Sequence, residues 1–167
     1  MAKRSSTTKI TRIPEDRLRA GWIVAVSQHV VIEQSSETNC GPACAQMLFA
    51  DRGLQIDQAQ ISSGFHVPCE AKPLADRLNQ LSPLIWLGGY YDLPITSQAI
   101  ESLLRKGSWA ALMELDGAST VGHWIIVDDV DLKTKLLQVR DPVGRAYLVP
   151  FAKFKPLWEF GWLVIER

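Results

Sequence analysis

Apolar positions recur every three or four residues through much of the first half of the chain, which is the spacing of a helix face. The clearest case follows Thr38-Asn39, where either residue can cap a helix that carries Pro42 in its first turn. Asp51-Arg52-Gly53 then supplies a stop signal. The same spacing predicts three further helices, over 57–62, over 72–81 and from Thr96 to Gly107.

From residue 109 onward the pattern changes to short runs of β-branched, aliphatic and aromatic residues separated by turn residues. These runs predict strands over 109–115, 123–130, 136–141, 146–149 and 162–165, after an earlier strand over 84–87. The segment 22–32 is either a strand or an extended stretch, and 88–91 is a turn or a mobile loop. Helices followed by an antiparallel sheet indicate an α+β fold with segregated halves.

Composition is that of one globular domain long enough to bury a core, with 167 residues of which 47% are hydrophobic. Lys plus Arg (18) balances Asp plus Glu (18), which argues against a protein that binds nucleic acid mainly through phosphates. Residues 1–18 are polar and basic and predict a flexible N-terminal tail ahead of a domain over 19–167. Neither a signal-peptide core nor a membrane-spanning stretch is visible. We therefore expect a cytoplasmic protein, or one exported without a classical signal peptide.

Cys40 is the strongest candidate nucleophile because it stands where the longest early helix should begin. Free N–H groups and partial positive charge at a helix N-terminus favour the reactive thiolate. Cys44 fits a buried packing position, and Cys69 a loop or half-buried thiol. His66, close to Cys69, lacks a helix start or an acidic partner. The cysteines are too few for a disulfide scaffold, and their spacing predicts no metal site.

His123 and Asp141 can supply a base and its orienting acid. His123 opens a predicted strand, and a turn centred on Leu132 would set it opposite Asp141 on the next strand. A carboxylate there fixes the imidazole tautomer and stabilises the imidazolium. The acids nearer the turn are expected to be solvated turn residues, namely Asp128, Asp129 and Asp131.

Gln34 is a candidate for the oxyanion hole because it precedes Cys40 by only six residues. Its amide can donate to the oxygen of a tetrahedral intermediate together with the Cys40 backbone N–H. Gln28 competes for this role from twelve residues away. The tryptophans in the predicted second half are expected to be core residues, with Trp124 on the strand face opposite His123: Trp109, Trp124, Trp158 and Trp162.

Together these residues resemble the papain-like cysteine protease clan, and more closely its C39 peptidase-like families, which include bacteriocin-processing domains and stand-alone relatives. The resemblance covers about 28–165 and implies a papain-like fold, with the cysteine-bearing helix packed on a C-terminal antiparallel sheet. The spacing is also similar to that of small effector proteases that bacteria inject into host cells. The matching pieces are Gln34, Cys40-Gly41-Pro42-Ala43-Cys44 with Met47, Gly122-His123-Trp124-Ile125-Ile126-Val127, and Asp141-Pro142 with Gly144.

The resemblance implies hydrolysis of a peptide bond through a thioester, with Cys40 as nucleophile, His123 as base, Asp141 as orienting residue and Gln34 in the oxyanion hole. It implies no metal or organic cofactor. The expected partner is a peptide or protein substrate, joined by an inhibitor or immunity protein if the chain is a toxin. Two alternatives stay open: an effector- or toxin-type deamidase or transglutaminase acting on protein glutamine, and a non-catalytic peptide-binding module of the same fold.

Overall fold

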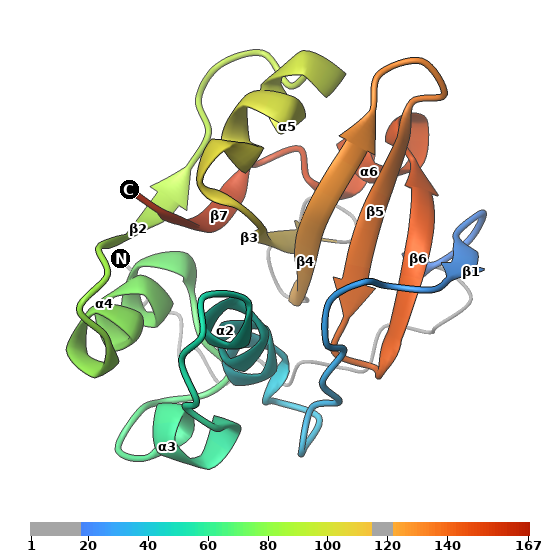
Figure 1. The fold of residues 1–167 in the computed structure, drawn as a ribbon. Coiled ribbons are helices and arrows are strands. Elements are labelled where there is room, and N and C mark those ends of the chain that lie inside the picture. The colour runs from blue at the N-terminus through green and yellow to red at the C-terminus, as the bar shows by residue number, and fades with distance from the viewer. Residues whose placement is uncertain (1–17, 115–121) are drawn as a thin grey trace, which may run out of the picture.

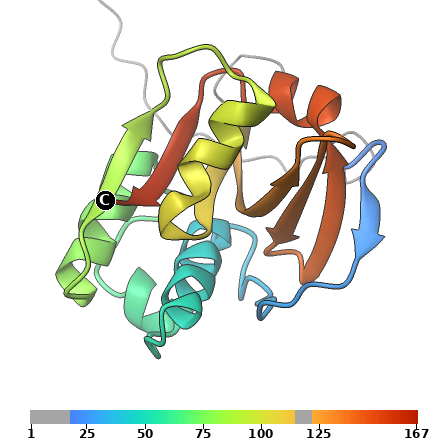
Figure 2. The ribbon, with the colours of Figure 1, turned by 45° about the horizontal axis from the view of Figure 1, so that its top comes forward.

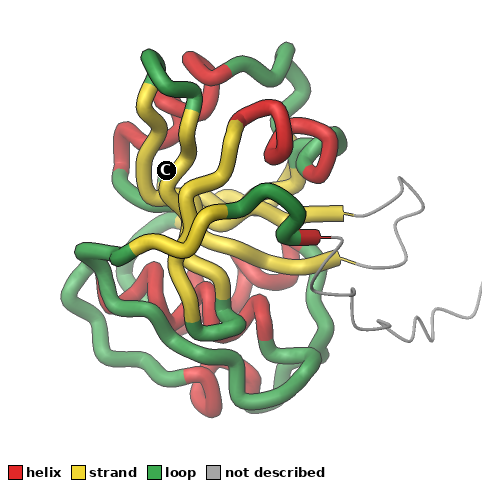
Figure 3. Tube along the Cα trace, turned by 90° about the vertical axis from the view of Figure 1, so that its right-hand side faces the viewer, coloured by secondary structure: helices red, strands yellow, loops and turns green. Residues whose placement is uncertain are grey.

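The computed structural model describes residues 18–114 and 122–167. Its centre is a seven-stranded antiparallel sheet in the order β1-β6-β5-β4-β3-β7-β2, with helices on both sides (Figures 1 and 3). Residues 1–17 of the predicted tail and the segment 115–121 between two predicted strands lie outside the described residues. The strands are β1 Ile23–Ala25, β2 Trp86–Tyr90, β3 Trp109–Glu114, β4 Gly122–Asp131, β5 Leu136–Asp141, β6 Arg145–Pro150 and β7 Trp162–Glu166.

The helices predicted from apolar spacing are confirmed. The Asp57 side chain accepts from the Gln60 N–H, and the Thr96 hydroxyl oxygen accepts from the Ala99 N–H, so both helices begin at side-chain caps. Across the described residues, none of the helices combines the length and apolar character that crossing a membrane requires. The helices are α2 Cys40–Asp51, α3 Gln58–Ser62, α4 Ala71–Leu81, α5 Ser97–Leu103 with a 3₁₀ turn over Leu104–Lys106, and α6 Phe151–Leu157.

Two segments differ from the sequence prediction. Residues 88–90 belong to β2 and pair with β7, where a turn or loop was expected. Gly88 explains this, because a Cβ there would collide with the Ala71 carbonyl oxygen, so glycine lets β2 lie against the start of α4. Helix α6 lies where no element was predicted, and it contains Pro156, which in a seven-residue helix removes little hydrogen bonding.

Two apolar clusters cover the two faces of the sheet. The first lies under α2 and α4 and includes Trp124; the second lies under α5 and α6 and includes Trp109 and Trp158. Figure 2 shows these four helices around the strands. These three tryptophans are buried as predicted, whereas Trp162 is 36% exposed, because it begins β7 at the end of the sheet. Leu18 is only 2% exposed and packs in the second cluster, so the folded part of the chain includes this last residue of the predicted tail.

Candidate active site

The N-terminal end of α2 presses closely against β4. A Cβ on Gly41 would lie 2.5 Å from the Cys69 Sγ and 3.3 Å from Cδ1 of Trp124. Glycine at this position therefore allows the first turn of α2 to contact Trp124, whose indole N–H donates to the Cys69 carbonyl (3.0 Å). Trp124 points away from the imidazole of His123, as the alternation of a strand predicts. The close packing brings Cys40, the first residue of α2, beside the first residues of β4.

Cys40 and His123 form a hydrogen-bonded pair at this junction. Burial disfavours the charged thiolate, but the hydrogen bond and charge of His123 and the backbone N–H groups of Trp124 and Gly41 outweigh it. The pKa of Cys40 is therefore lowered from 9.0. Burial also opposes the charge on His123, yet Asp141 and Cys40 raise the pKa of this imidazole to about 9. These directions favour a thiolate–imidazolium pair at neutral pH.

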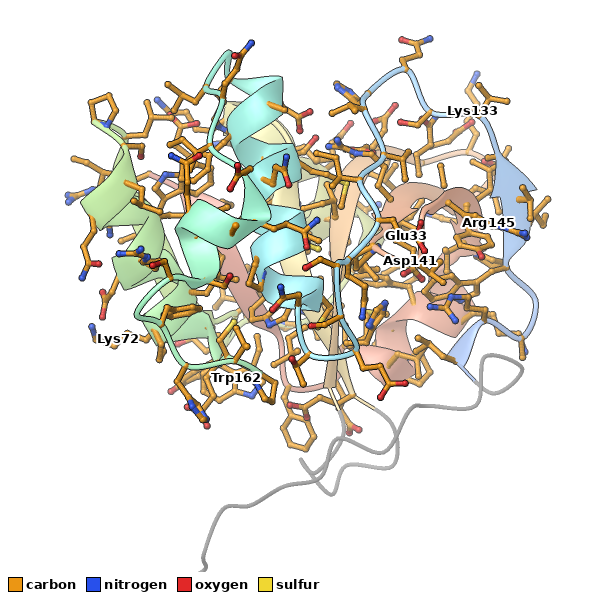
Figure 4. The ribbon with its side chains drawn as sticks, turned by 90° about the horizontal axis from the view of Figure 1, so that it is seen from below. Glu33, Lys72, Lys133, Asp141, Arg145 and Trp162 are labelled. Atoms are coloured by element: carbon orange, nitrogen blue, oxygen red, sulfur yellow. The ribbon has the colours of Figure 1, made fainter. Side chains whose placement is uncertain are left out.

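Asp141 holds the other side of the imidazole. His123 Nε2 lies 2.7 Å from Asp141 Oδ1, which leaves Nδ1 as the ring nitrogen for the thiol. Arg19 Nε donates to Asp141 Oδ2 (2.7 Å), and the Val143 N–H donates to Oδ1 (2.9 Å). Burial raises the pKa of this fully covered carboxyl, but His123 and Arg19 outweigh that effect and lower it to about 2. Asp141 thus remains charged where it orients the base (Figure 4).

The register between β4 and β5 differs from the one predicted for His123 and Asp141. Ile126 pairs with Arg140, and continuing this register places Asp141 opposite Ile125 rather than His123. The offset is two residues, so both side chains keep the same face of the sheet and meet diagonally. The pair predicted from sequence is therefore present, although its pairing register was wrong by two residues.

Arg19 is a site residue that the sequence analysis missed. It immediately follows the predicted tail and is 122 positions from Asp141, so no local motif joins them. Its guanidinium gives Asp141 a second cationic partner, and its side chain is only 13% exposed. Arg19 is the first residue of the predicted domain over 19–167, and its neighbour Leu18 is buried in the structure.

Gln34 lies next to the site, with its amide engaged elsewhere. Its backbone N–H donates to the Pro142 carbonyl (2.7 Å), which fixes it beside the turn that follows Asp141. Its side-chain Nε2 donates to the Ser36 carbonyl (2.7 Å). The competing Gln28 is exposed. The oxyanion role of Gln34 stays a prediction, because the amide must turn away from Ser36 to fulfil it.

The thiol pKa values of the other two cysteines are shifted in the opposite direction, upward. Cys44 is fully buried in α2, and burial together with the nearby Cys40 raises its thiol pKa well above 9.0. Cys69 is half-buried, and the same two causes raise its thiol pKa to about 12. Cys44 is therefore buried and Cys69 half-buried, as predicted, and the thiol pKa is lowered at Cys40 but raised at the other two cysteines. Within the described residues, no group of three or more His, Cys, Asp and Glu side chains is placed to hold a metal ion.

A buried ion cluster fixes the distance between α2 and the strands of the site. Arg140 is fully buried; its Nη2 lies 2.6 Å from Asp51 Oδ2 and 2.8 Å from Asp128 Oδ1. These bonds tie the end of α2 to β4 and β5. The prediction that Asp128 is a solvated turn residue is therefore wrong, because it lies inside the protein. Asp131 does serve the turn, accepting from the Lys133 N–H (2.8 Å).

Solved structures share this arrangement of helices and sheet. The peptidase domain of Streptococcus ComA, a bifunctional ABC transporter of a quorum-sensing pathway, matches with a TM-score of 0.66 at 14% identity, covering 83% of this chain and 98% of that one. This chain has the papain-like fold of C39 peptidase domains. A double-glycine-motif protease from an AMS/PCAT transporter, solved with its leader peptide, matches the same fold (TM-score 0.63, 17% identity, 87% of this chain and 96% of that one).

A third solved structure shares the C39 fold, and one curated protein is similar in sequence. The N-terminal peptidase C39-like domain of a toxin secretion ATP-binding protein from Vibrio parahaemolyticus gives a TM-score of 0.57 at 13% identity, covering 80% of this chain and all of that one. Cysteine protease effector 1 of Escherichia coli is 33% identical over 129 residues, 77% of this chain. The chain spans about a quarter (25%) of that relative's length. No family model matches the sequence.

Proposed function

We propose that this chain is a cysteine peptidase that hydrolyses a peptide bond with Cys40, His123 and Asp141. The observation that carries the proposal is the bonded series from Asp141 through His123 to Cys40, in which the thiol pKa is lowered and the imidazole pKa is raised. The curated relative named a cysteine protease effector and the C39 fold support the same activity.

In the proposed reaction the Cys40 thiolate attacks the carbonyl carbon of the scissile bond and forms a tetrahedral intermediate. The imidazolium of His123 then gives its proton to the leaving amine, and the C–N bond breaks to leave a thioester on Cys40. Neutral His123 next takes a proton from water, whose oxygen attacks the thioester and releases the acid. Asp141 keeps the imidazole oriented in both steps.

The developing oxyanion needs donors beside Cys40. The start of α2 supplies backbone N–H groups that lack partners within the helix. We assign the second donor to the Gln34 amide, since its backbone is fixed beside Pro142 and a side-chain rotation away from Ser36 frees its N–H groups. Loss of one such donor typically costs about 3 kcal/mol of transition-state stabilisation.

The same comparisons support a proposed substrate class. A C39 neighbour was solved in complex with a leader peptide, which supports a peptide or protein as the substrate of this chain. The effector name of the curated relative supports action on a target protein. Deamidation or transglutamination of a protein glutamine uses the same thiolate chemistry and is the second candidate. Binding of an inhibitor or immunity protein stays a prediction. So does the location, either cytoplasmic or outside the cell after export without a classical signal peptide.

Thiol reactivity tests the proposed nucleophile, with the other two cysteines as internal controls. The purified protein is treated with iodoacetamide from pH 4 to 9, and each cysteine is followed by mass spectrometry. We expect Cys40 to react well below pH 8, while Cys44 and Cys69 stay slow because their thiol pKa values are raised. His123→Ala should remove the advantage of Cys40. Equal rates at Cys40 and Cys69 would contradict the activated nucleophile.

The product then separates the candidate activities. Incubation of the enzyme with a mixture of folded cellular proteins should yield new N-termini that are absent when Cys40→Ala is used. A one-dalton gain at glutamine without new termini would identify a deamidase instead. If Cys40→Ala retains full biological activity and folding, the chain is a binding module rather than an enzyme.

A further inference from the structure

Glu114 carries a buried carboxylate that the proposed reaction does not use. It is the last described residue of β3 and is only 9% exposed. Its Oε2 atom is covered and has no hydrogen-bond partner among residues 18–114 and 122–167. Burial raises the pKa of this carboxyl, as expected for an acid without a compensating cation. An unpaired buried carboxylate is unfavourable, and a cation brought from outside would relieve it.

Glu114 is a backbone neighbour of the strand position that carries the proposed catalytic base. In the β3–β4 ladder Met113 pairs with His123 and Glu114 pairs with Gly122. The Glu114 backbone is therefore about one strand residue, roughly 3–4 Å, from the Met113–His123 pair, and its side chain lies on the opposite face of the sheet, which Trp124 shares. Gly122 has no side chain, and a Cβ there would lie 2.9 Å from the Leu112 Cδ1. No side chain of β4 therefore stands directly opposite Glu114.

An apolar shelf runs across the sheet beside Glu114, on the same face. We define it as Leu112 of β3, Trp162 of β7 and Tyr90 of β2. Trp124 of β4 pairs with Leu112, and Tyr90 pairs with Trp162. Between β3 and β7, Ala110 pairs with Val164, and extending this register by two residues places Leu112 opposite Trp162. Paired residues share a face, so the shelf extends outward from Trp124.

The shelf lies at the same end of the sheet as Cys40. The far end of α2 contacts the far end of β7, where Arg52 Nε bonds Glu166 (2.6 Å). The near end of α2 contacts Trp124 through Gly41. Trp162 is at the opposite end of β7 from Glu166, so it belongs to the Cys40 end. Figure 4 shows Trp162 and Asp141 on opposite sides of α2.

The shelf is open and aromatic. Tyr90 is 63% exposed and Trp162 36% exposed, and their rings meet edge to face with centroids 5.3 Å apart. Ordered aromatic side chains at the surface are favourable contacts for a partner's apolar or aliphatic groups. A chain that crosses the start of α2 toward this shelf passes Leu112, with Glu114 two residues further along β3 on the same face.

We propose that Glu114 and the shelf select a peptide that carries a lysine or arginine next to an apolar residue, within three residues on one side of the scissile bond. The cationic side chain pairs with Glu114 while the apolar residue packs on Trp162 and Tyr90. This proposal rests on the proposed peptidase function and deepens it by naming the substrate class. Glu114 is thus a specificity-determining residue whose carboxylate the substrate, rather than the protein, neutralises.

Peptidyl vinyl sulfones that alkylate Cys40 test this preference. Each of the three positions before the vinyl sulfone carries in turn lysine, its neutral isostere norleucine or glutamate, with leucine at the neighbouring position. Alkylation rates are measured by intact mass for the wild type, Glu114→Gln and Glu114→Lys. Glu101→Gln, an exposed glutamate on α5, is the matched control. Glu114→Gln removes only the charge, and thermal unfolding confirms that it folds.

We expect lysine to exceed norleucine by at least tenfold at one position in the wild type and Glu101→Gln. This ratio should fall to near one in Glu114→Gln, and a glutamate probe should be preferred by Glu114→Lys. Alkylation without a lysine preference, or a preference that survives Glu114→Gln, overturns this inference and leaves the peptidase standing. If iodoacetamide reacts at Cys40 but no peptide probe does, both proposals fail.

Discussion

Replacing Asp141 by asparagine isolates the charge that supports the base. Asparagine keeps an oxygen for the Val143 N–H and for His123, so the change removes mainly the negative charge. The carboxyl is fully covered, and its pKa falls from 3.8 to about 2 in the folded protein. At about 1.4 kcal/mol for each pKa unit, the charge stabilises the fold by about 2 kcal/mol at pH 7.

The sign of the pH dependence follows from the lowered pKa of Asp141. Its stabilisation is fully present above 3.8 and is lost as the pH falls toward about 2. About half of it should therefore remain at pH 3. The amide nitrogen that faces Arg19 in the variant adds a cost that does not depend on this titration.

Urea unfolding of the wild type and Asp141→Asn at pH 7 and pH 3 separates the pH-dependent contribution of the charge from the pH-independent cost of the amide. The stability difference should shrink by about 1 kcal/mol on going to pH 3. Asp76→Asn is the control, because Asp76 pairs with Lys72 on the exposed surface of α4 and should cost less than about 0.5 kcal/mol. A difference that is equal at the two pH values would refute the electrostatic reasoning. Iodoacetamide labelling at pH 6 should also slow at Cys40 in Asp141→Asn.

Three further changes test the site and its support. The kcat/KM for a cleaved peptide should rise with pH as Cys40 ionises below 9.0, and it should fall above about pH 9 as His123 loses its proton. A kcat/KM that keeps rising above about pH 9 would exclude the ion pair. Arg140→Met should lower the free energy of unfolding by about 3–5 kcal/mol in urea, because two carboxylates lose their buried partner; a loss below about 1 kcal/mol would contradict this. Gly88→Ala should lower the Tm by at least about 2–4 °C, whereas Gly89→Ala, which meets open space, should change it less; equal shifts would show that β2 does not need the close approach.

Much of the site was readable from the sequence because its signals are local. A cysteine at a helix start needs only the helix boundary, and Cys40 is indeed the first residue of α2. His123 and Asp141 lie on neighbouring strands joined by one turn, so their meeting needed only the strand alternation. That argument survived a two-residue error in register, since side chains two apart share a face.

The parts that sequence reasoning missed depend on contacts between distant segments. Arg19 reaches Asp141 across 122 positions, and Asp128 is drawn inside by Arg140 and Asp51 rather than left at the turn. Gly88 looked like a turn residue because its need for close packing against α4 is invisible without the helix.

The sequence by itself determined the chemistry of this protein: which thiol begins a helix, which imidazole opens a strand and which acid follows on the next strand. Helix periodicity, strand alternation and capping are short-range effects, so these choices need no knowledge of the whole fold. Only the tertiary structure decided which charges surround that chemistry, through Arg19 beside Asp141 and through Glu114, whose Oε2 is buried without a partner among the described residues 18–114 and 122–167. Burial and pairing between distant segments set charge energetics, and these exist only once the chain has folded.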